Sequence, residues 1–431
     1  MDSAVKQMRP EPQARFESPW LTETGRRIRD QVSEIVPMLR DTAAEGEKLG
    51  ALAPQAVAAL SELGVFRLTL PTDFGGLALG ARDTVEIISE VSRGDGAAGW
   101  TAFVAGGLRN MLTFPDQAVN EVFADVKEWK GPIAAGASIF ATKVGDARKV
   151  EGGYMVSGSW HFGSGCKHAK WIGVGCDYEL PGGRKARGMA ILERDQVEIV
   201  DNWHVMGLKA TSSNSITVKG EVFCPEHRFM DMMEFPRRMD ESRRRYKGFA
   251  SKFDGRGLML VTNLSVVSIV LGMARGALEV FIDMARKQKP FNLPYDRVAD
   301  MASTQVIAAK AYGAIRAAEA VVLANADLLD RHAQEGREIP MDLEQAMVME
   351  AVWAAHSLDD VIGELQRTIG SATASEKNPI QRFARDTRVA LLHGAIRLEP
   401  MAEIYGRLMM GVAPFPMFGG GLPDPAAAGK A

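Results

Sequence analysis

The chain has 431 residues, of which 46% are hydrophobic and 24% charged, and its formal net charge is −3. This composition is typical of a globular protein with two or three domains, and the small net charge argues against nucleic acid or an anionic membrane as a partner. The three cysteines form no CxxC pair, which argues against a zinc site or a disulfide framework. We therefore expect a protein of the reducing cytoplasm.

The N-terminal part of the chain is predicted to be helical after a short polar arm. Residues 1–20 lack the apolar segment of a signal peptide and are expected to form a flexible arm. Apolar residues then recur at spacings of three and four, which predicts a helical domain over residues 21–130. Its predicted elements are two helices within 22–64, a structured loop over 63–80, and helices at 81–93, 97–112 and 115–125.

The middle of the chain, residues 131–240, has the pattern of a small β-domain. Valine, isoleucine, threonine and tryptophan alternate with polar residues, and glycine or aspartate interrupts the pattern at short intervals. The segments YMVSGSWHFGSG, KWIGVGCDY, RGMAILER, VEIVDNWHVMG and SITVKGEVF are each expected to contain a strand. Short strands at this spacing indicate a sandwich or a barrel.

The helical period returns in the C-terminal part, which predicts a four-helix bundle over residues 241–412 and a tail over 413–431. The uncharged run at 257–274 approaches membrane-spanning length, but four polar residues interrupt it, so we interpret it as a buried core helix. The fold is therefore expected to be mainly α with a central β-domain. The predicted helices of the bundle lie at 257–288, 296–331, 341–370 and 379–410.

The segment GSWHFGSG contains the first group of residues that could bind a ligand. A strand of period two places Trp160, Phe162 and Ser164 on one face, and Gly165 lets a ligand approach the backbone closely. Aromatic rings and a hydroxyl suit a flat heteroaromatic ligand. The alternative is a β-domain core with a glycine-rich turn.

A second group follows in DNWHVMGLKATSSNS. Trp203 precedes a cluster of polar residues that includes Thr211 and Ser213. Such a cluster commonly caps a turn, but it could equally cradle the edge of a flat cofactor ring or a phosphate. Both interpretations remain open from these residues alone.

The third group lies on the predicted helix that begins NPIQRF. Arg382, Asp386, Val389 and His393 fall on one helical face, and the first two could form an intrahelical ion pair. A single histidine on a helix is more often structural than catalytic. The other six histidines show no ligand spacing, so we expect no metal site. No GxGxxG motif follows a predicted strand, and the GxxxxGK[ST] and GxSxG motifs do not occur.

Taken in order, LGVFRLTLPTDFGG, VSGSWHFGSG and WHVMGLKATSSNSITVKGEVFCPEHRF resemble motifs of the acyl-CoA dehydrogenase fold superfamily, over residues 22–412. Within that superfamily, Ser164 and the segment NPIQRFARDTRVALLHG, which ends near His393, are similar to the oxygenase components of two-component (group D) flavin-dependent monooxygenases. These hydroxylases often have a further histidine in the segment that corresponds to AFVAGGLRNMLTFP. This chain has no histidine there and so departs from their pattern.

The resemblance implies a homotetramer that receives reduced FMN or FADH2 from a separate flavin reductase. With O2 this flavin would form a C4a-hydroperoxide, which hydroxylates a small phenol-like or indole-like compound. The site residues implied are catalytic His393, Ser164 and Asn110; cofactor-binding Trp160, Phe162, Ser164, Gly165, Trp203, Thr211, Ser213, Arg286 and Arg382, with the last two arginines directed to the flavin phosphate; and substrate-binding Trp100, Arg109, Asp386 and Val389.

Other functions remain open for the same fold. An acyl-CoA dehydrogenase needs a catalytic carboxylate beside the flavin, and a nitroalkane-type oxidase needs an aspartate base; the sequence offers no convincing residue for either role. Oxidation at nitrogen or sulfur is a further alternative, because the missing histidine makes deprotonation of a phenol less certain. A non-catalytic scaffold that has lost the flavin belongs to a different class and would bind no flavin.

Overall fold

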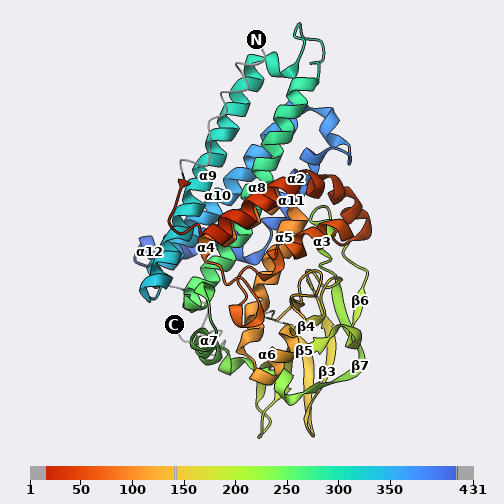
Figure 1. The fold of residues 1–431 in the computed structure, drawn as a ribbon, viewed down its shortest axis with the longest axis vertical. Helices are drawn as coiled ribbons and strands as arrows, with labels where there is room; N and C mark the ends of the chain where they lie inside the picture. The colour runs from red at the N-terminus through yellow and green to blue at the C-terminus, as the bar shows by residue number, and fades with distance from the viewer. Residues whose placement is uncertain (1–15, 140, 142, 414, 416–431) are drawn as a thin grey trace.

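The computed structural model describes residues 16–139, 141, 143–413 and 415. Most of the predicted arm over 1–20 and almost all of the tail over 413–431 lie outside these residues. Figure 1 shows a long helical bundle in the upper part of the molecule and a β-domain at the lower right, with α5 between them. The expected order of helical domain, β-domain and helical bundle is confirmed.

The N-terminal domain contains the helices that the apolar spacing predicts. Thr22 begins the first of them by accepting a hydrogen bond from the Gly25 N–H, and Gly50 ends it in the left-handed conformation. The predicted helix at 97–112 is shorter, because two adjacent glycines lead into a 3-10 helix, η4 (Gly107–Thr113). The helices of the domain are α2 (Glu23–Leu49), α3 (Pro54–Glu62), α4 (Ala81–Gly94), α5 (Gly96–Gly106) and α6 (Asp116–Phe123).

The β-domain is one sheet with the strand order β6-β7-β3-β2-β4-β5-β8, and β1 pairs with β4 in parallel. The three cysteines, Cys166, Cys176 and Cys224, are free and buried in its core. The predicted strand in VEIVDNWHVMG is reduced to three residues. The strands are β1 (Ala134–Ala137), β2 (Gly145–Val150), β3 (Gly153–Trp160), β4 (Trp171–Glu179), β5 (Lys185–Glu193), β6 (Glu198–Val200), β7 (Ser215–Pro225) and β8 (Phe229–Asp231).

The C-terminal bundle differs from its prediction at one place. A single helix over 379–410 is wrong, since α11 ends at Ala390 and α12 begins at Leu398. Gly394 and Pro400 account for the break, because glycine disfavours a helix and proline is tolerated in the first turn of a helix, as in α12, but not in a helix interior. The helices are α7 (Phe235–Arg245), α8 (Gly255–Lys287), α9 (Ala302–Glu335), α10 (Met341–Ile369), α11 (Pro379–Ala390) and α12 (Leu398–Met409).

Helix α8 forms the centre of the bundle. Within the described part of the chain it is the one helix long and apolar enough to cross a membrane, and 83% of that stretch is buried inside the protein. It packs very closely on α4: a Cβ atom added at Gly272 would lie 2.1 Å from the Ser89 carbonyl oxygen. This close crossing fixes α4, and α5 follows α4 directly in the chain. The bundle thereby positions the residues of α5 that face the β-domain.

Candidate active site

A chain of hydroxyl groups joins α5 to the β-domain. The Trp100 indole N–H donates to Ser164 Oγ at 3.3 Å, and Ser164 and Ser213 lie 2.7 Å apart. Ser213 Oγ also lies 2.7 Å from Thr211 Oγ1. The Thr211 hydroxyl in turn donates to the Leu208 carbonyl at 2.9 Å. Because the last bond fixes the direction of the chain, each hydroxyl donates toward Leu208. Ser164 Oγ therefore accepts from Trp100 and keeps one lone pair for an N–H donor of a ligand.

Two loops of the β-domain hold these hydroxyls in register. The Gly163 N–H donates to the Asn214 carbonyl at 3.0 Å, and the Gly165 N–H donates to the Thr211 carbonyl at 2.8 Å. Cys166 adds a thiol hydrogen bond to the Ser212 carbonyl at 3.0 Å. Both loops are therefore fixed by backbone contacts rather than by the hydroxyl chain alone.

His393 lies on the bundle side of Trp100. The ring centroids of the two residues are 5.4 Å apart in an edge-to-face arrangement, and the Phe103 ring lies 6.4 Å from His393. His393 Nδ1 accepts the Ala395 N–H at 3.4 Å, so the neutral imidazole carries its proton on Nε2. The neighbouring rings partly desolvate the imidazole and lower the pKa of His393, although the residue is exposed in the single chain.

Phe162 is held in an unusual conformation beside Trp203. Its φ is +58°, in the left-handed region that bulky residues rarely adopt, and 66% of its surface is exposed. The rings of Phe162 and Trp203 are 6.2 Å apart and nearly perpendicular, and the Trp203 N–H donates to the Leu208 carbonyl at 3.1 Å. An exposed aromatic ring in a costly backbone conformation indicates a ligand contact.

Trp160 does not belong to this group, and its surroundings oppose its prediction as a cofactor contact. It is fully buried in the core of the β-domain, where its indole N–H donates to the Gly175 carbonyl at 2.7 Å. The period-two expectation for Trp160, Phe162 and Ser164 failed because β3 ends at Trp160 and the chain turns at Phe162. The two aromatic residues consequently point to different surroundings.

The residues predicted on α11 are also placed differently. The Asp386 carboxylate accepts the Leu208 N–H at 2.6 Å, and both Asp386 and Arg382 are buried. Arg382 lies 3.8 Å from the Glu47 carboxylate rather than pairing with Asp386. These contacts oppose the assignment of Arg382 to the flavin phosphate and of Asp386 to the substrate. Since α11 ends before His393, the predicted shared face with Val389 is lost as well.

The buried carboxyl of Asp386 makes stability depend on pH. Burial raises its pKa to about 7, with Asp95 and Glu47 adding repulsion. Its folded pKa exceeds the unfolded value, so the protonated form stabilises the fold and this contribution is lost as the pH rises from about 4 to about 7. The free energy of unfolding should therefore decrease as the pH rises, and we expect Asp386→Asn to make this decrease smaller by on the order of 2 kcal/mol.

Urea denaturation at several pH values between 5 and 8 tests this expectation. The asparagine keeps an acceptor for the Leu208 N–H, so the variant should fold. Glu376→Gln removes an exposed carboxyl and is the matched control. A variant with the same pH slope as the unmodified chain would contradict the role given to Asp386.

The remaining predicted residues lie on η4 and at the end of α8. Arg109 is buried, and Asn110 is partly buried with its carbonyl accepting from Thr113. Arg286 is exposed near the C-terminal end of α8, the end of the bundle that points away from the β-domain in Figure 1. Sequence reasoning missed Phe103, although its spacing of three residues from Trp100 on one helix indicated a shared face.

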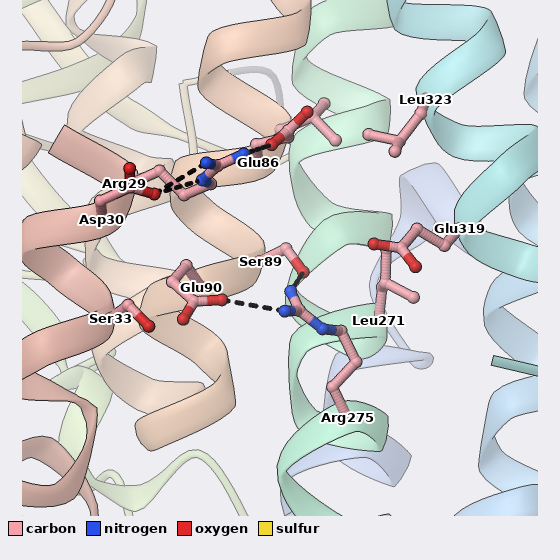
Figure 2. Close-up of a pocket in the computed structure, with 11 residues that line it drawn as sticks. Arg29, Asp30, Ser33, Glu86, Ser89, Glu90, Leu271, Arg275, Glu319 and Leu323 are labelled. Carbon is pink, nitrogen blue, oxygen red and sulfur yellow. Dashed lines mark hydrogen bonds and ion pairs between the residues drawn. The ribbon is translucent and has the colours of Figure 1, made fainter. Parts of the chain in front are cut away.

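A separate pocket between α2, α4, α8 and α9 does not include these residues (Figure 2). Its arginines have partners within the chain: Arg29 pairs with Glu86 at 2.7 Å, and Arg275 with Glu90 at 3.1 Å. A pocket whose charges are already paired has no strong preference for a charged ligand. The candidate site is therefore the junction of α5, the β-domain and His393, where the predicted site residues meet.

Comparison with family models places both helical parts of the chain in one family. Residues 22–120 match the acyl-CoA dehydrogenase N-terminal domain, and residues 264–397 match the acyl-CoA dehydrogenase C-terminal domain. Together the two domains cover more than half of the chain. The resemblance stated from the sequence motifs is confirmed.

Individual relatives match over most of their length. The oxygenase subunit HsaA, a flavin-dependent monooxygenase of Mycobacterium tuberculosis, is 29% identical over 89% of this chain and 95% of its own. A crystal structure of that enzyme has a TM-score of 0.78, at 27% identity over 91% of this chain and 98% of the other. The oxygenase component of an FADH2-dependent resorcinol hydroxylase of Rhizobium is 26% identical over 92% of this chain and 97% of its own. An indole-3-acetate monooxygenase of Pseudomonas putida is 27% identical over 88% of this chain and 92% of its own. The chain therefore belongs to the acyl-CoA dehydrogenase family, and these relatives within it are flavin-dependent monooxygenases.

Proposed function

We propose that this chain is the oxygenase component of a two-component flavin-dependent monooxygenase that hydroxylates a small aromatic or heteroaromatic compound. The observation that carries the proposal is the junction where the hydroxyl chain ending at Ser164 meets Trp100 and His393. The relatives described above, matched along most of the chain, support the same activity.

The described residues fit a flavin. Ser164 Oγ has a lone pair available for a ring N–H, and reduced flavin carries such a donor at N5. Phe162 and Trp203 offer exposed or partly exposed aromatic surface to the flat ring. The buried Ser212 Oγ and Asn214 Oδ1 lack hydrogen-bond partners and are available to a polar cofactor. Reduced flavin supplies the two electrons that activate O2.

The protein residues have separate tasks in this reaction. Trp100 and Phe103 cover one side of His393, which the single chain otherwise leaves exposed, and this apolar cover limits proton leakage and loss of hydrogen peroxide. Ser164 orients the cofactor ring. His393 presents its Nε2–H to the reacting oxygen and holds or returns a proton there.

The proposal includes reduced FMN or FADH2 as the cofactor, delivered by a separate flavin reductase. We also propose a cytoplasmic homotetramer. The exposed position of Arg286 near the end of α8 agrees with a contact to the flavin phosphate of a neighbouring subunit, since Arg286 lies away from the site of its own chain. The buried free cysteines agree with a reducing compartment.

Rapid mixing tests the proposal. Anaerobic protein with reduced FMN or FADH2 is mixed with O2, and absorbance is followed. An oxygenase will give a transient spectrum that differs from both reduced and oxidised flavin and outlives free reduced flavin. Ser164→Ala removes one cofactor hydrogen bond and should shorten this lifetime about fivefold to tenfold. Ser159→Ala, an exposed serine on β3, is the control.

The opposite outcome is equally clear. Immediate reoxidation without a transient would rule out the oxygenase and direct attention to acyl-CoA substrates with an electron acceptor. A chain that binds no flavin in either redox state would instead be a non-catalytic scaffold.

A further inference from the structure

Arg109 on η4 has a buried positive charge without a carboxylate partner among the described residues. Its side chain is 8% exposed, its Nη1 donates to the Thr69 carbonyl at 3.0 Å, and its Nε has no hydrogen-bond partner. Burial lowers the pKa of Arg109 to about 10, with repulsion from Arg243 as the next cause. A buried guanidinium is normally paired, because an isolated charge in the interior is costly.

Two further unpaired donors belong to the same region. Arg243 Nε on α7 is buried without a partner, and the other nitrogens of that guanidinium contact Asp240 and the Lys252 carbonyl, each at 3.3 Å. The Tyr246 hydroxyl is also buried and unpartnered, and its ring belongs to the same apolar cluster as Met111 of η4. The nitrogens Arg109 Nε and Arg243 Nε and the Tyr246 hydroxyl all lack partners, and all three can donate hydrogen bonds. A ligand that satisfies them is therefore a hydrogen-bond acceptor with negative charge.

The position of η4 connects this charge to the active site. It continues directly from α5, whose Trp100 and Phe103 face His393. Arg109 is nine positions after Trp100, about 15 Å along a chain that is first α-helix and then 3-10 helix. An added Cβ atom at Gly107, between them, would meet no atom within 4 Å, so the intervening turn borders open space.

We propose that Arg109, assisted by Arg243, binds the carboxylate of an elongated aromatic acid whose ring is oxidised beside His393. This inference rests on the proposed function and specifies its substrate class. The relatives include an enzyme named for neutral resorcinol and one named for indole-3-acetate, so relationship alone does not decide between neutral and acidic substrates. The unpaired charge of Arg109 favours the acid.

Matched acids and amides provide the test. We would titrate the flavin-loaded protein anaerobically with indole-3-acetate and indole-3-acetamide, and with 3-(4-hydroxyphenyl)propionate and its amide. Each acid should bind about 10-fold to 100-fold more tightly than its amide, the range of a charge-assisted hydrogen bond. Arg109→Met should reduce this ratio to near one without weakening the amide, whereas Arg109→Lys should retain part of it.

Control variants distinguish a role of Arg109 in binding the ligand carboxylate from a role in folding. Arg237→Met removes an exposed arginine of α7 and should leave the ratio unchanged. Since Arg109 is an uncompensated charge, Arg109→Met should raise the melting temperature of the ligand-free protein. If Arg109→Met does not fold, Arg109→Gln and Arg243→Met provide the same measurement.

The proposal would be overturned by equal affinity for acid and amide in the unmodified protein, by a ratio insensitive to Arg109, or by equal weakening of both ligands. Weaker binding of FMN but not of riboflavin by Arg109→Met would assign the arginine to the cofactor phosphate and also overturn it. Because these titrations exclude O2, they fail or succeed independently of the rapid-mixing test of oxygenase activity.

Discussion

Replacing His393 with alanine is expected to lower coupled product formation by about 100-fold or more, with flavin binding largely retained. The imidazole lies edge-to-face with Trp100, 5.4 Å between ring centroids, and the indole N–H of that tryptophan donates to Ser164. Positioned proton transfer contributes about 10²-fold to 10⁴-fold in enzymes, and no other histidine of the described chain contacts this group of rings. Product and hydrogen peroxide should be measured together, since uncoupling converts one into the other.

The protonation state of His393 adds a pH dependence. Partial desolvation lowers its pKa, so the ring is neutral at pH 7 and presents Nε2–H, while Nδ1 accepts the Ala395 N–H. As the pH falls through this lowered pKa, protonation of Nδ1 breaks that bond and coupled turnover should fall. His227→Gln, a histidine paired with Glu121 in another part of the molecule, is the control and should leave the profile unchanged. A His393→Ala enzyme with normal coupling would exclude the proposed proton role.

Trp160→Ala should cost about 3–5 kcal/mol of folding free energy, because it leaves a large cavity in the β-domain. Its indole is fully buried, and its N–H satisfies the Gly175 carbonyl, which would lose its partner. The free energy of unfolding from urea titrations checks this effect. Flavin affinity, measured below the unfolding transition, should change little.

Phe162→Ala, only two residues away, should leave stability nearly unchanged and weaken flavin binding. The Phe162 side chain is 66% exposed, and its left-handed backbone suits a smaller residue no worse, so stability should change by less than about 1 kcal/mol. Its loss removes part of the aromatic surface proposed for the flavin and should weaken flavin binding about tenfold. If Trp160→Ala weakened flavin binding while Phe162→Ala left it intact, the placement of the two aromatic residues would be refuted.

These two positions show which information the sequence contained. The alternating pattern correctly predicted a strand that includes Trp160, but it extended that strand to Phe162 and Ser164, which lie beyond its end. The reversal at Phe162 was not predictable, because alternation applies only while the strand continues and a φ of +58° is imposed by the surrounding loop contacts. Thr211 and Ser213 lie nearly fifty residues from Ser164, so their contact depends on the β-domain rather than on local spacing.

The helical segments gave a similar result. Apolar spacing predicted the bounds of α8 and α10 closely, because these helices have long regular apolar faces. The same spacing continued across the break after α11, where Gly394 and Pro400 were the relevant signals. Asp386 has a polar side chain on a helix that the sequence alone could not orient, and its contact with Leu208 required the β-domain to be placed against the bundle.

The burial of the cysteines has a consequence for the working lifetime of such an enzyme. Burial raises the pKa of Cys166 to about 11 and that of Cys224 to about 12, and it raises the pKa of Cys176 as well. Peroxide oxidises the thiolate form, which these residues scarcely populate at neutral pH. Hydrogen peroxide released near Ser164, where the flavin is proposed to bind, should therefore leave the thiols intact, even though Cys166 is only two residues away. Inactivation during prolonged uncoupled turnover should then proceed through exposed methionines such as Met206, not through sulfenic acid formation.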